Sequence, residues 1–445
     1  MGSSITDLGG THTYVFGIND AGQAVGYSTM SSGRTHAFVW QNGAMTDLGL
    51  LPNSYLDGYV SDASAINGQG QVVGQATGSP SMVDHLVLWQ NGTATVLGDP
   101  QHFGYANAIN DLGQVVGVTG PAYTSLGMPR AFLWQNGVMA DLGALPGATG
   151  TNGWGFLSNA KGINNAGQVV GWSMTSSGTS EHAFLWQNGT MTDLGVLSRG
   201  SSSEALAIND EGQIVGDTSF GSATGGTVTH ATLWQKGSLI DLDGNSSSSG
   251  AIAIDGAGDI VGWAGTSAML WHHGTMINLN LFLSAGSGWV LTKATGINDS
   301  GQIIGQGTHG GVSSAFVLSL DVTSLPATYT AQGAVQSYYA DQIALAVSVA
   351  DSTANVTASL DALQALASSG KLSSIALTDS GTPTLTVTAA QAGHDAGALH
   401  AIFGSYTLDV TGTTATIGAF LAKEDVNGRG LGGIAAEYSG IAPSG

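Results

Sequence analysis

The chain has 445 residues, of which 42% are hydrophobic and only 9% charged, so it can bury a large core and is too apolar for an intrinsically disordered protein. Its 30 acidic residues outnumber the 9 basic ones, and the formal net charge of -21 disfavours nucleic acid and anionic lipid as partners. No cysteine is present, which excludes disulfides, cysteine nucleophiles and thiolate metal ligands, and no apolar run is long enough for a membrane span.

A repeated motif of the form Ile-Asn-x-x-Gly-Gln-x-Val-Gly occupies most of the chain. Consecutive copies are 43 to 54 residues apart, a period that is typical of propellers and repeat arrays. The residues at the Asn position are Asn19, Asn67, Asn110, Asn164, Asn209, Asp255 and Asn298.

A second repeated element, His-Ala-Phe-Leu-Trp-Gln-Asn-Gly-x-Met-Thr-Asp-Leu-Gly, follows each copy and is cleanest at residues 182–195. In the seventh copy it fades at residues 314–318, and no Asp-Leu-Gly segment follows. That missing segment stands at the other end of the chain, at residues 5–9. The tryptophans of this element are Trp40, Trp89, Trp134, Trp186, Trp234 and Trp271.

Each unit predicts four short strands, which in the fourth copy cover residues 159–163, 168–172, 182–186 and 190–194. One four-stranded sheet of this size has too little core to be stable alone, so seven of them are expected to close into a β-propeller over residues 5–320. Residues 5–9 are expected to complete the seventh blade beside Phe316 and so to lock the ring without an open edge. The fold class is thus predicted to be mainly β.

After Leu320 the repeat stops. Residues 321–330 are predicted to be a linker, and residues 331–445 a small α/β module. Ser352 is the expected cap of a helix that presents Val356, Leu360 and Leu363 on one face. The pattern around this helix restarts 61 residues later, which indicates an α/β repeat with one complete and one partial copy.

The two repeated motifs resemble the HAF type of bacterial extracellular repeat. The resemblance implies a repeat protein outside the cytoplasm and no particular biochemical activity. The carboxy-terminal part resembles repeats of large bacterial secreted and adhesin-like proteins, which implies a spacer, an attachment module or a module for self-association. The chain departs from the repeat pattern at Arg130 and Ser267 in the His position, at Leu318 in the Trp position, and at Asp255 and Asp259 in the Asn and Gln positions.

The connections between the hairpins vary in length and carry aromatic residues that do not repeat. Loops on a rigid scaffold commonly carry function, and exposed aromatic rings make good contacts to sugars and proteins. An alternative is that these rings only cover the blade edges. The candidate ligand-binding residues are Tyr55, Tyr59, Phe103, Tyr105, Trp154, Phe156 and Trp289.

No catalytic or metal-binding constellation stands out. The repeated His36, His85, His182 and His230 are expected to hydrogen-bond to a neighbouring blade rather than to hold a metal, because equivalent positions lie in different blades. The Asn-Asp turns lack the ligand spacing of a calcium loop, so calcium has no support and no cofactor is expected.

The sequence therefore favours a secreted or cell-surface binding or adhesion protein that is not an enzyme. Its expected partner is a glycan or a cell-surface protein, with self-association through the carboxy-terminal module. Two alternatives remain open: a self-assembling structural component of a surface or matrix, and a polysaccharide-active enzyme with its site over the propeller axis.

Overall fold

The computed structural model describes residues 4–51, 60–78, 83–99, 102–121, 128–149, 156–221, 227–243, 248–272, 275–284, 286–320, 347–379, 383–403 and 406–411. The chain divides into two compact units, one of residues 1–272 and 278–324 and the other of residues 273–277 and 325–445. The predicted linker lies outside the described residues. None of the described helices is long and apolar enough to cross a membrane.

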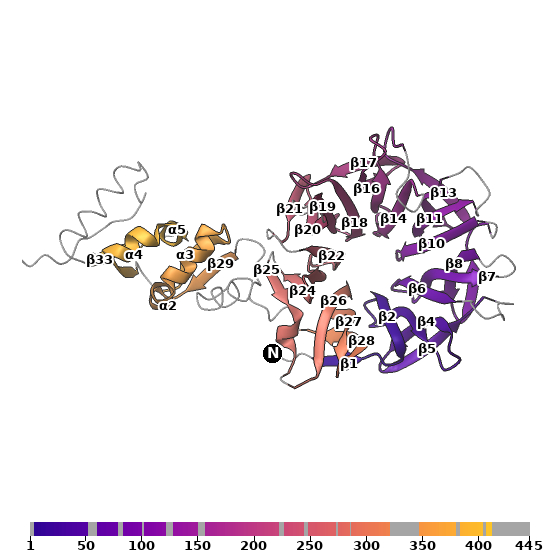
Figure 1. Cartoon of the computed structure of the whole chain (residues 1–445), viewed down its shortest axis with the longest axis horizontal. Coiled ribbons are helices and arrows are strands. Elements are labelled where there is room, and N and C mark those ends of the chain that lie inside the picture. Colours follow the sequence, from indigo (N-terminus) through magenta and orange to yellow (C-terminus); the bar gives the residue numbers. More distant parts are fainter. Residues whose placement is uncertain are drawn as a thin grey trace, which may run out of the picture. The chain divides into compact units, whose positions relative to one another are not determined.

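The described residues between 4 and 320 form a ring of seven four-stranded antiparallel sheets, the blades of a β-propeller (Figure 1). Blades 1 to 3 consist of β2 (Thr11–Ile18), β3 (Ala24–Thr29), β4 (Thr35–Gln41) and β5 (Ala44–Gly49); β6 (Ser61–Ile66), β7 (Val72–Gly78), β8 (Val83–Gln90) and β9 (Thr93–Val96); β10 (His102–Ile109), β11 (Val115–Pro121), β12 (Arg130–Gln135) and β13 (Val138–Gly143). Blades 4 and 5 consist of β14 (Ser158–Ile163), β15 (Val169–Met174), β16 (Glu181–Gln187) and β17 (Thr190–Gly195); β18 (Ser202–Ile208), β19 (Ile214–Gly221), β20 (Thr227–Gln235) and β21 (Ser238–Asp241).

Blade 6 consists of β22 (Ser249–Ile254), β23 (Ile260–Ala264), β24 (Ser267–His272) and β25 (Thr275–Asn278), and the 3-10 helix η1 (Leu279–Phe282) follows it. Blade 7 joins β26 (Trp289–Ile297), β27 (Gln302–His309) and β28 (Val312–Ser319) to β1 (Ser4–Asp7). β1 runs antiparallel to β28, with Ser4 opposite Ser319 and Asp7 opposite Phe316. The predicted seven-bladed fold, closed by the amino-terminal strand, is confirmed.

In six of the seven blades the motif Asn holds the blade to the next one. In blade 4, Asn164 Oδ1 accepts hydrogen bonds from the backbone N–H groups of Ala166 (3.1 Å) and Gln168 (3.0 Å), which shapes the turn between β14 and β15. Its Nδ2 donates to the carbonyl of Asn209 in blade 5 (3.0 Å). The second Gly of the motif is needed for close pairing, because a Cβ on Gly171 would lie 2.0 Å from the carbonyl oxygen of Asn159.

Apolar side chains from neighbouring blades form the core. The cluster between blades 4 and 5, for example, joins Val170 and Ala183 of one blade to Ala205, Ile208 and Trp234 of the next. Trp234 is 3% exposed and Trp271 is 1% exposed, which confirms a packing role for these blade tryptophans.

Three of the four repeated histidines pair with an Asp of their own blade, which corrects the expectation of a bond to a neighbouring blade. His182 Nδ1 lies 2.8 Å from Asp193 Oδ2 on the next strand of blade 4, His36 pairs with Asp47 at 2.8 Å, and His230 with Asp241 at 2.9 Å. The fourth strand is hydrogen-bonded to the third, so the acidic partner of each of these three belongs to the same sheet. Blade 2 has Val96 at the Asp position, and His85 Nδ1 has no hydrogen-bond partner among the described residues.

The second unit is a small α/β module, as predicted. Its elements are β29 (Val347–Asp351), α2 (Thr353–Ala358), α3 (Leu360–Ser368), β30 (Leu372–Leu377), β31 (Thr384–Thr388), α4 (Ala389–His394), α5 (Ala396–His400), β32 (Ile402–Phe403) and β33 (Thr407–Thr411). The strands pair in parallel in the orders β29-β30-β32 and β31-β33. Ser352 caps α2 as expected, but the predicted single helix is divided in two at Ser359. The predicted second copy of the repeat lies largely outside the described residues.

Candidate functional site

The first strand of every blade lies nearest the propeller axis, and all seven blades line a cavity of about 640 Å³ there (Figure 1). One lining residue per blade stands three positions before the motif Asn. This position holds a different residue in every blade. The Ile-Asn pair that begins two residues later is the same in every blade except blade 6, where it is Ile-Asp. The seven residues are Phe16, Ser64, Asn107, Lys161, Leu206, Ile252 and Thr295. We call this the axial cavity.

A β-bulge places these variable residues. In every blade the pairing of the first two strands shifts register at this position, as between Ala160 and Gly162 around Lys161, and between Ala63 and Ala65 around Ser64. A bulge leaves one residue without a partner on the neighbouring strand and redirects its side chain, a device common beside binding and active sites. The repeat thus presents seven different side chains from one constant frame.

Aromatic residues form the blade 1 side of the axial cavity. The ring of Tyr27 lies 5.0 Å from that of Tyr14 and 5.7 Å from that of Phe16. Tyr14 is 38% exposed and Phe16 41% exposed. Burial raises the pKa of Tyr27, and Tyr14 and Asp62 raise it further. Exposed rings beside a cavity form a platform on which an apolar face of a ligand can stack.

A carboxyl and amide pair follows in blade 2. Gln75 Nε2 donates a hydrogen bond of 2.7 Å to Asp62 Oδ2, and both residues line the axial cavity. Burial raises the pKa of Asp62 to about 6; the bond from Gln75 lowers it, and the charge of Asp84 raises it. Gln75 Oε1 is buried and has no hydrogen-bond partner among the described residues.

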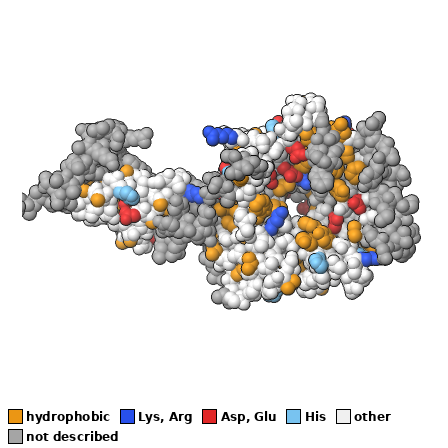
Figure 2. All heavy atoms as spheres, viewed as in Figure 1, with side chains coloured by type: hydrophobic (Ala, Val, Ile, Leu, Met, Phe, Trp, Pro, Cys, Tyr) orange, Lys and Arg blue, Asp and Glu red, His pale blue; other side chains and the backbone are white. Residues whose placement is uncertain are grey.

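Lys161 of blade 4 also lines the axial cavity, and charged residues of blades 5 and 7 lie around it. Lys161 Nζ lies 3.3 Å from Glu204 Oε1. Asp217 is directly opposite Glu204 in the sheet and occupies the repeat position that Gln75 has in blade 2. Burial raises the pKa of Asp217 to about 7; Glu204 raises it and Lys293 lowers it. Figure 2 shows acidic side chains on two sides of the hollow at the centre of the ring, with a basic side chain beside it.

A second, smaller cavity of about 300 Å³ lies on the axis where the motif turns of all seven blades meet. Its acidic residues serve the ring itself. Asp111 Oδ1 accepts from the backbone of Gly68 (2.8 Å), and Asp210 Oδ1 accepts from that of Asn165 (2.8 Å). These side chains link neighbouring blades around the axis.

Blade 6 differs from the other blades in the polar side chains of its motif. Where the other blades have Asn and Gln, it has Asp255 and Asp259, and His272 replaces the Gln that follows the Trp. Asp259 Oδ1 lies 2.7 Å from His272 Nδ1. The exposed fractions are 5%, 3% and 7% for Asp255, Asp259 and His272, so blade 6 buries ionisable groups where other blades bury neutral amides.

The structure places the predicted loop aromatics in several settings. Tyr55, Tyr59 and Trp154 lie outside the described residues. The Phe103 ring lies 6.4 Å from that of Tyr105 and 6.2 Å from that of Phe156. Phe103 and Tyr105 belong to β10 and not to a loop.

Trp289 also lies in a strand, β26, and is only 8% exposed. Its ring stacks on that of His309 at 4.6 Å and meets Phe316 edge-on at 6.1 Å. It therefore packs in blade 7. The sequence analysis did not predict the axial residues. The signal that could have found them is that the position three residues before the motif Asn differs in every blade, whereas the motif itself is nearly constant.

No family model matches the chain, and neither does any curated protein. Among solved structures it is similar to a puromycin-hydrolyzing peptidase of Mycobacterium tuberculosis, with 11% identity and a TM-score of 0.45, covering 71% of this chain and 52% of that one. It is also similar to the β-propeller domain of the trilobed protease of Pyrococcus furiosus, with 9% identity, a TM-score of 0.43 and coverage of 68% and 95%. An oligogalacturonate lyase of Vibrio parahaemolyticus matches at 9% identity, a TM-score of 0.42 and coverage of 72% and 94%.

The chain spans about half the length of the puromycin-hydrolyzing peptidase that it matches. These likenesses concern the propeller fold, which serves binding and scaffolding in general. The prediction that this chain is not an enzyme is corrected in one respect: the structures to which it is similar include puromycin-hydrolyzing peptidases and an oligogalacturonate lyase.

Proposed function

We propose that the propeller binds a carbohydrate in the axial cavity. The observation that carries the proposal is that two aromatic rings, Phe16 and Tyr27, and the half-buried polar pair Asp62 and Gln75 line one cavity of about 640 Å³. A sugar ring has apolar C–H faces that stack on aromatic rings and a rim of hydroxyl groups that need donors and acceptors.

The polar groups of the cavity suit hydroxyl groups. Asp62 accepts hydrogen bonds, and the buried Gln75 Oε1 has an acceptor site open to a ligand hydroxyl. Lys161 adds a donor on the blade 4 side of the cavity, where its Nζ lies 3.3 Å from Glu204 Oε1. A ligand hydroxyl at Gln75 Oε1 would satisfy a buried polar atom, which favours binding.

A glycan array of the full chain tests this proposal. We expect binding that Phe16→Ala and Asp62→Asn each weaken by about tenfold or more, since loss of a stacking ring or of a charged acceptor costs about 1.5 kcal/mol or more. The matched control is Phe103→Ala, which removes the same kind of ring from the predicted loop site. Binding that Phe103→Ala abolishes and Phe16→Ala leaves intact would overturn the axial site, and so would the absence of any glycan ligand.

A second candidate function is acid-base catalysis on a polysaccharide in the same cavity. The specific observation is that burial raises the pKa of Asp62 to about 6 and that of Asp217 to about 7, so that near neutral pH Asp217 can act as an acid while Asp62 is mostly ionised and can act as a base. Product formation that Asp217→Asn and Asp62→Asn each abolish, with Phe103→Ala unaffected, would support it. Its rate should fall as the pH rises through about 7, because the acid form of Asp217 is then lost.

We further propose that the protein works outside the cytoplasm, on a glycan or a glycan-bearing surface protein. Support comes from the repeats, which resemble the HAF type, and from the acidic, cysteine-free composition. Fractionation of cells that produce the protein, with detection in medium, surface and cytoplasm, tests this location. Self-association through the α/β module is the corresponding proposal for assembly, and light scattering of the full chain at several concentrations tests it.

A further inference from the structure

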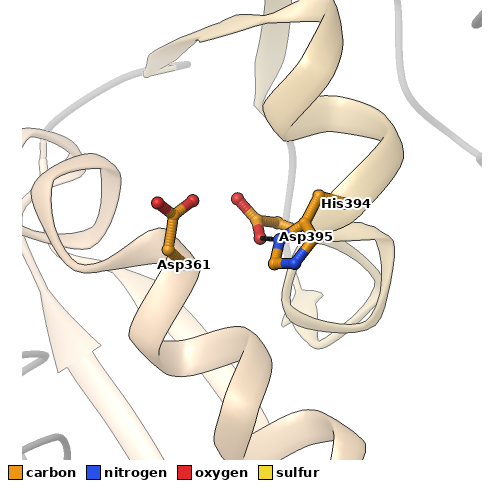
Figure 3. A group of neighbouring side chains, drawn as sticks. All are labelled: Asp361, His394 and Asp395. Atoms are coloured by element: carbon orange, nitrogen blue, oxygen red, sulfur yellow. Dashed lines mark hydrogen bonds and ion pairs between the residues drawn. The ribbon is translucent and has the colours of Figure 1, made fainter.

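Three ionisable side chains meet at one point of the α/β module (Figure 3). Asp361 stands in the first turn of α3, His394 ends α4, and Asp395 lies between α4 and α5. Among the residues that the structure describes, this is the one group of three or more His, Cys, Asp and Glu side chains whose ligand atoms all lie within 4.8 Å of one another. None of them takes part in the axial site.

Asp395 lacks one of the partners that a buried carboxylate requires. The residue is fully buried, at 0% exposed, and its Oδ1 is 2.5 Å from His394 Nδ1. Its Oδ2 is buried and has no hydrogen-bond partner among the described residues. In Figure 3 this carboxylate faces that of Asp361. Two carboxylates that face each other, one of them with a free buried oxygen, form a site that favours a positive group between them.

Burial raises the pKa of Asp395, the His394 bond lowers it, and Asp361 raises it. The cluster also offers an imidazole whose ring has room to move, since the His394 side chain is 71% exposed. The exposed Asp361 and His394 leave an approach to the buried oxygen from solvent.

We propose that Asp361, His394 and Asp395 bind one divalent transition-metal ion, with Zn²⁺ as the preferred ion. One imidazole nitrogen and two carboxylate oxygens are a common three-ligand set for Zn²⁺, with water as the fourth ligand. A purely carboxylate site would favour Ca²⁺ or Mg²⁺, whereas imidazole favours Zn²⁺ and its neighbours. Ligand atoms around Zn²⁺ stand about 3.3 Å apart in tetrahedral geometry, so the exposed His394 ring moves outward by less than about 1 Å.

The ion would link α3 to the junction of α4 and α5. These helices also meet through the Gln364 Oε1 bond to the backbone of Ala398 at 2.9 Å, so the segment around the cluster is already in place. The ion would thus stabilise a small module whose core is formed by short helices and strands.

Isothermal titration of the full chain with Zn²⁺, after removal of metals with a chelator, tests the site. The variants are His394→Ala and Asp361→Asn, both at exposed positions, so that folding is preserved. We expect one Zn²⁺ site in the native chain whose affinity falls about 10–100-fold or more in each variant, since even the loss of an outer partner of a metal ligand costs that much. Zn²⁺ should also raise the melting temperature of the native chain and not that of His394→Ala.

The matched control is His182→Ala. His182 forms the same kind of His and Asp pair on the propeller surface, at 2.8 Å from Asp193, but without a third ligand. The His182→Ala variant should bind Zn²⁺ as the native chain does. The proposal is overturned if the native chain binds no Zn²⁺, if His394→Ala binds it as the native chain does, or if only His182→Ala abolishes binding. Equal affinity for Ca²⁺ in the native chain and His394→Ala would also overturn it, because the imidazole would then have no role.

Discussion

At the scale of single residues, Asp255 is the most informative departure from the repeat. In six blades the motif Asn donates its amide to the carbonyl of the next blade, as Asn209 does to Asp255 (3.0 Å) and Asn298 to Asn19 (2.9 Å). A carboxylate has no such hydrogen. Burial raises the pKa of Asp255 to about 6, bonds from the backbone lower it, and the charges of Asp259 and Asp299 raise it.

Asp255→Asn should therefore stabilise the propeller in a pH-dependent way. The folded state holds the Asp255 proton more tightly than the unfolded state, so this contribution is complete below pH 4 and is lost as the pH rises through about 6. We expect the variant to gain about 1 to 2 kcal/mol in free energy of unfolding at pH 8, allowing for screening by water, and little at pH 4.

Urea denaturation of both proteins at pH 4, 6 and 8 measures this difference. The comparison removes the effect of Asp62 and Asp217, because both proteins contain them. A gain that is the same at all three pH values would show that the proton on Asp255 has no part in holding blades 6 and 7 together.

At the scale of elements, the turn between the first two strands carries the connection between blades. Asn164 accepts from two backbone N–H groups of its own turn and donates to one backbone carbonyl of the next blade, and it is 3% exposed. Its neighbour Asn165 is exposed, although Asn165 Nδ2 donates to Asp210 Oδ2 in the next blade (2.9 Å). Two adjacent residues of one type thus differ in burial and in the number of backbone groups that depend on them.

Asn164→Ala should lower the free energy of unfolding by about 2 to 4 kcal/mol, because it leaves buried backbone groups of two blades without partners. Asn165→Ala, the matched control, should cost less than about 1 kcal/mol because water replaces the lost bonds. Thermal and urea denaturation of the two variants measure the difference. Equal losses would contradict the view that the buried Asn ring, and not the exposed one, holds the blades together.

At the scale of the whole molecule, ring closure depends on one short strand. β1 covers the edge of β28, and Leu8 beyond it is 5% exposed and bonds through its N–H to the carbonyl of Ala315 (3.1 Å). Without β1, the seventh blade has three strands and an open edge. Open edges pair with other chains.

Deletion of residues 4–9 should lower the free energy of unfolding by more than about 3 kcal/mol and cause association, because it removes a buried Leu and a strand of backbone bonds. Leu8→Ala serves as the control: it should cost about 2 to 3 kcal/mol and leave the chain no more associated than before. Size exclusion and urea denaturation report both effects. A deletion variant that elutes and unfolds like the native chain would contradict closure by β1.

Much of the fold could be predicted because the same pattern of strands and turns occurs in seven copies along the chain. The four strands of blade 4 were placed within two residues of their ends, since Gly and Asn mark each turn, and Asn188 and Gly189 do take positive φ values of 51° and 81°. The closure of the ring could be predicted because the Asp-Leu-Gly segment that the seventh copy lacks stands at residues 5–9. The break between α2 and α3 was missed, because nothing in an apolar helical pattern marks Ser359 as the point of division.

The sequence by itself determined the number of blades, their strands and the way the ring closes, because these depend on local turn chemistry and on a period that repeats along the chain. Only the tertiary structure decided which residues meet. Asp62 and Glu204 are 142 residues apart, yet both stand five positions before a motif Asn, so the ring brings their blades to one cavity. Asp361 and Asp395 meet because α3 packs near α5. Contacts between distant segments depend on how elements pack, and a local pattern does not contain that information.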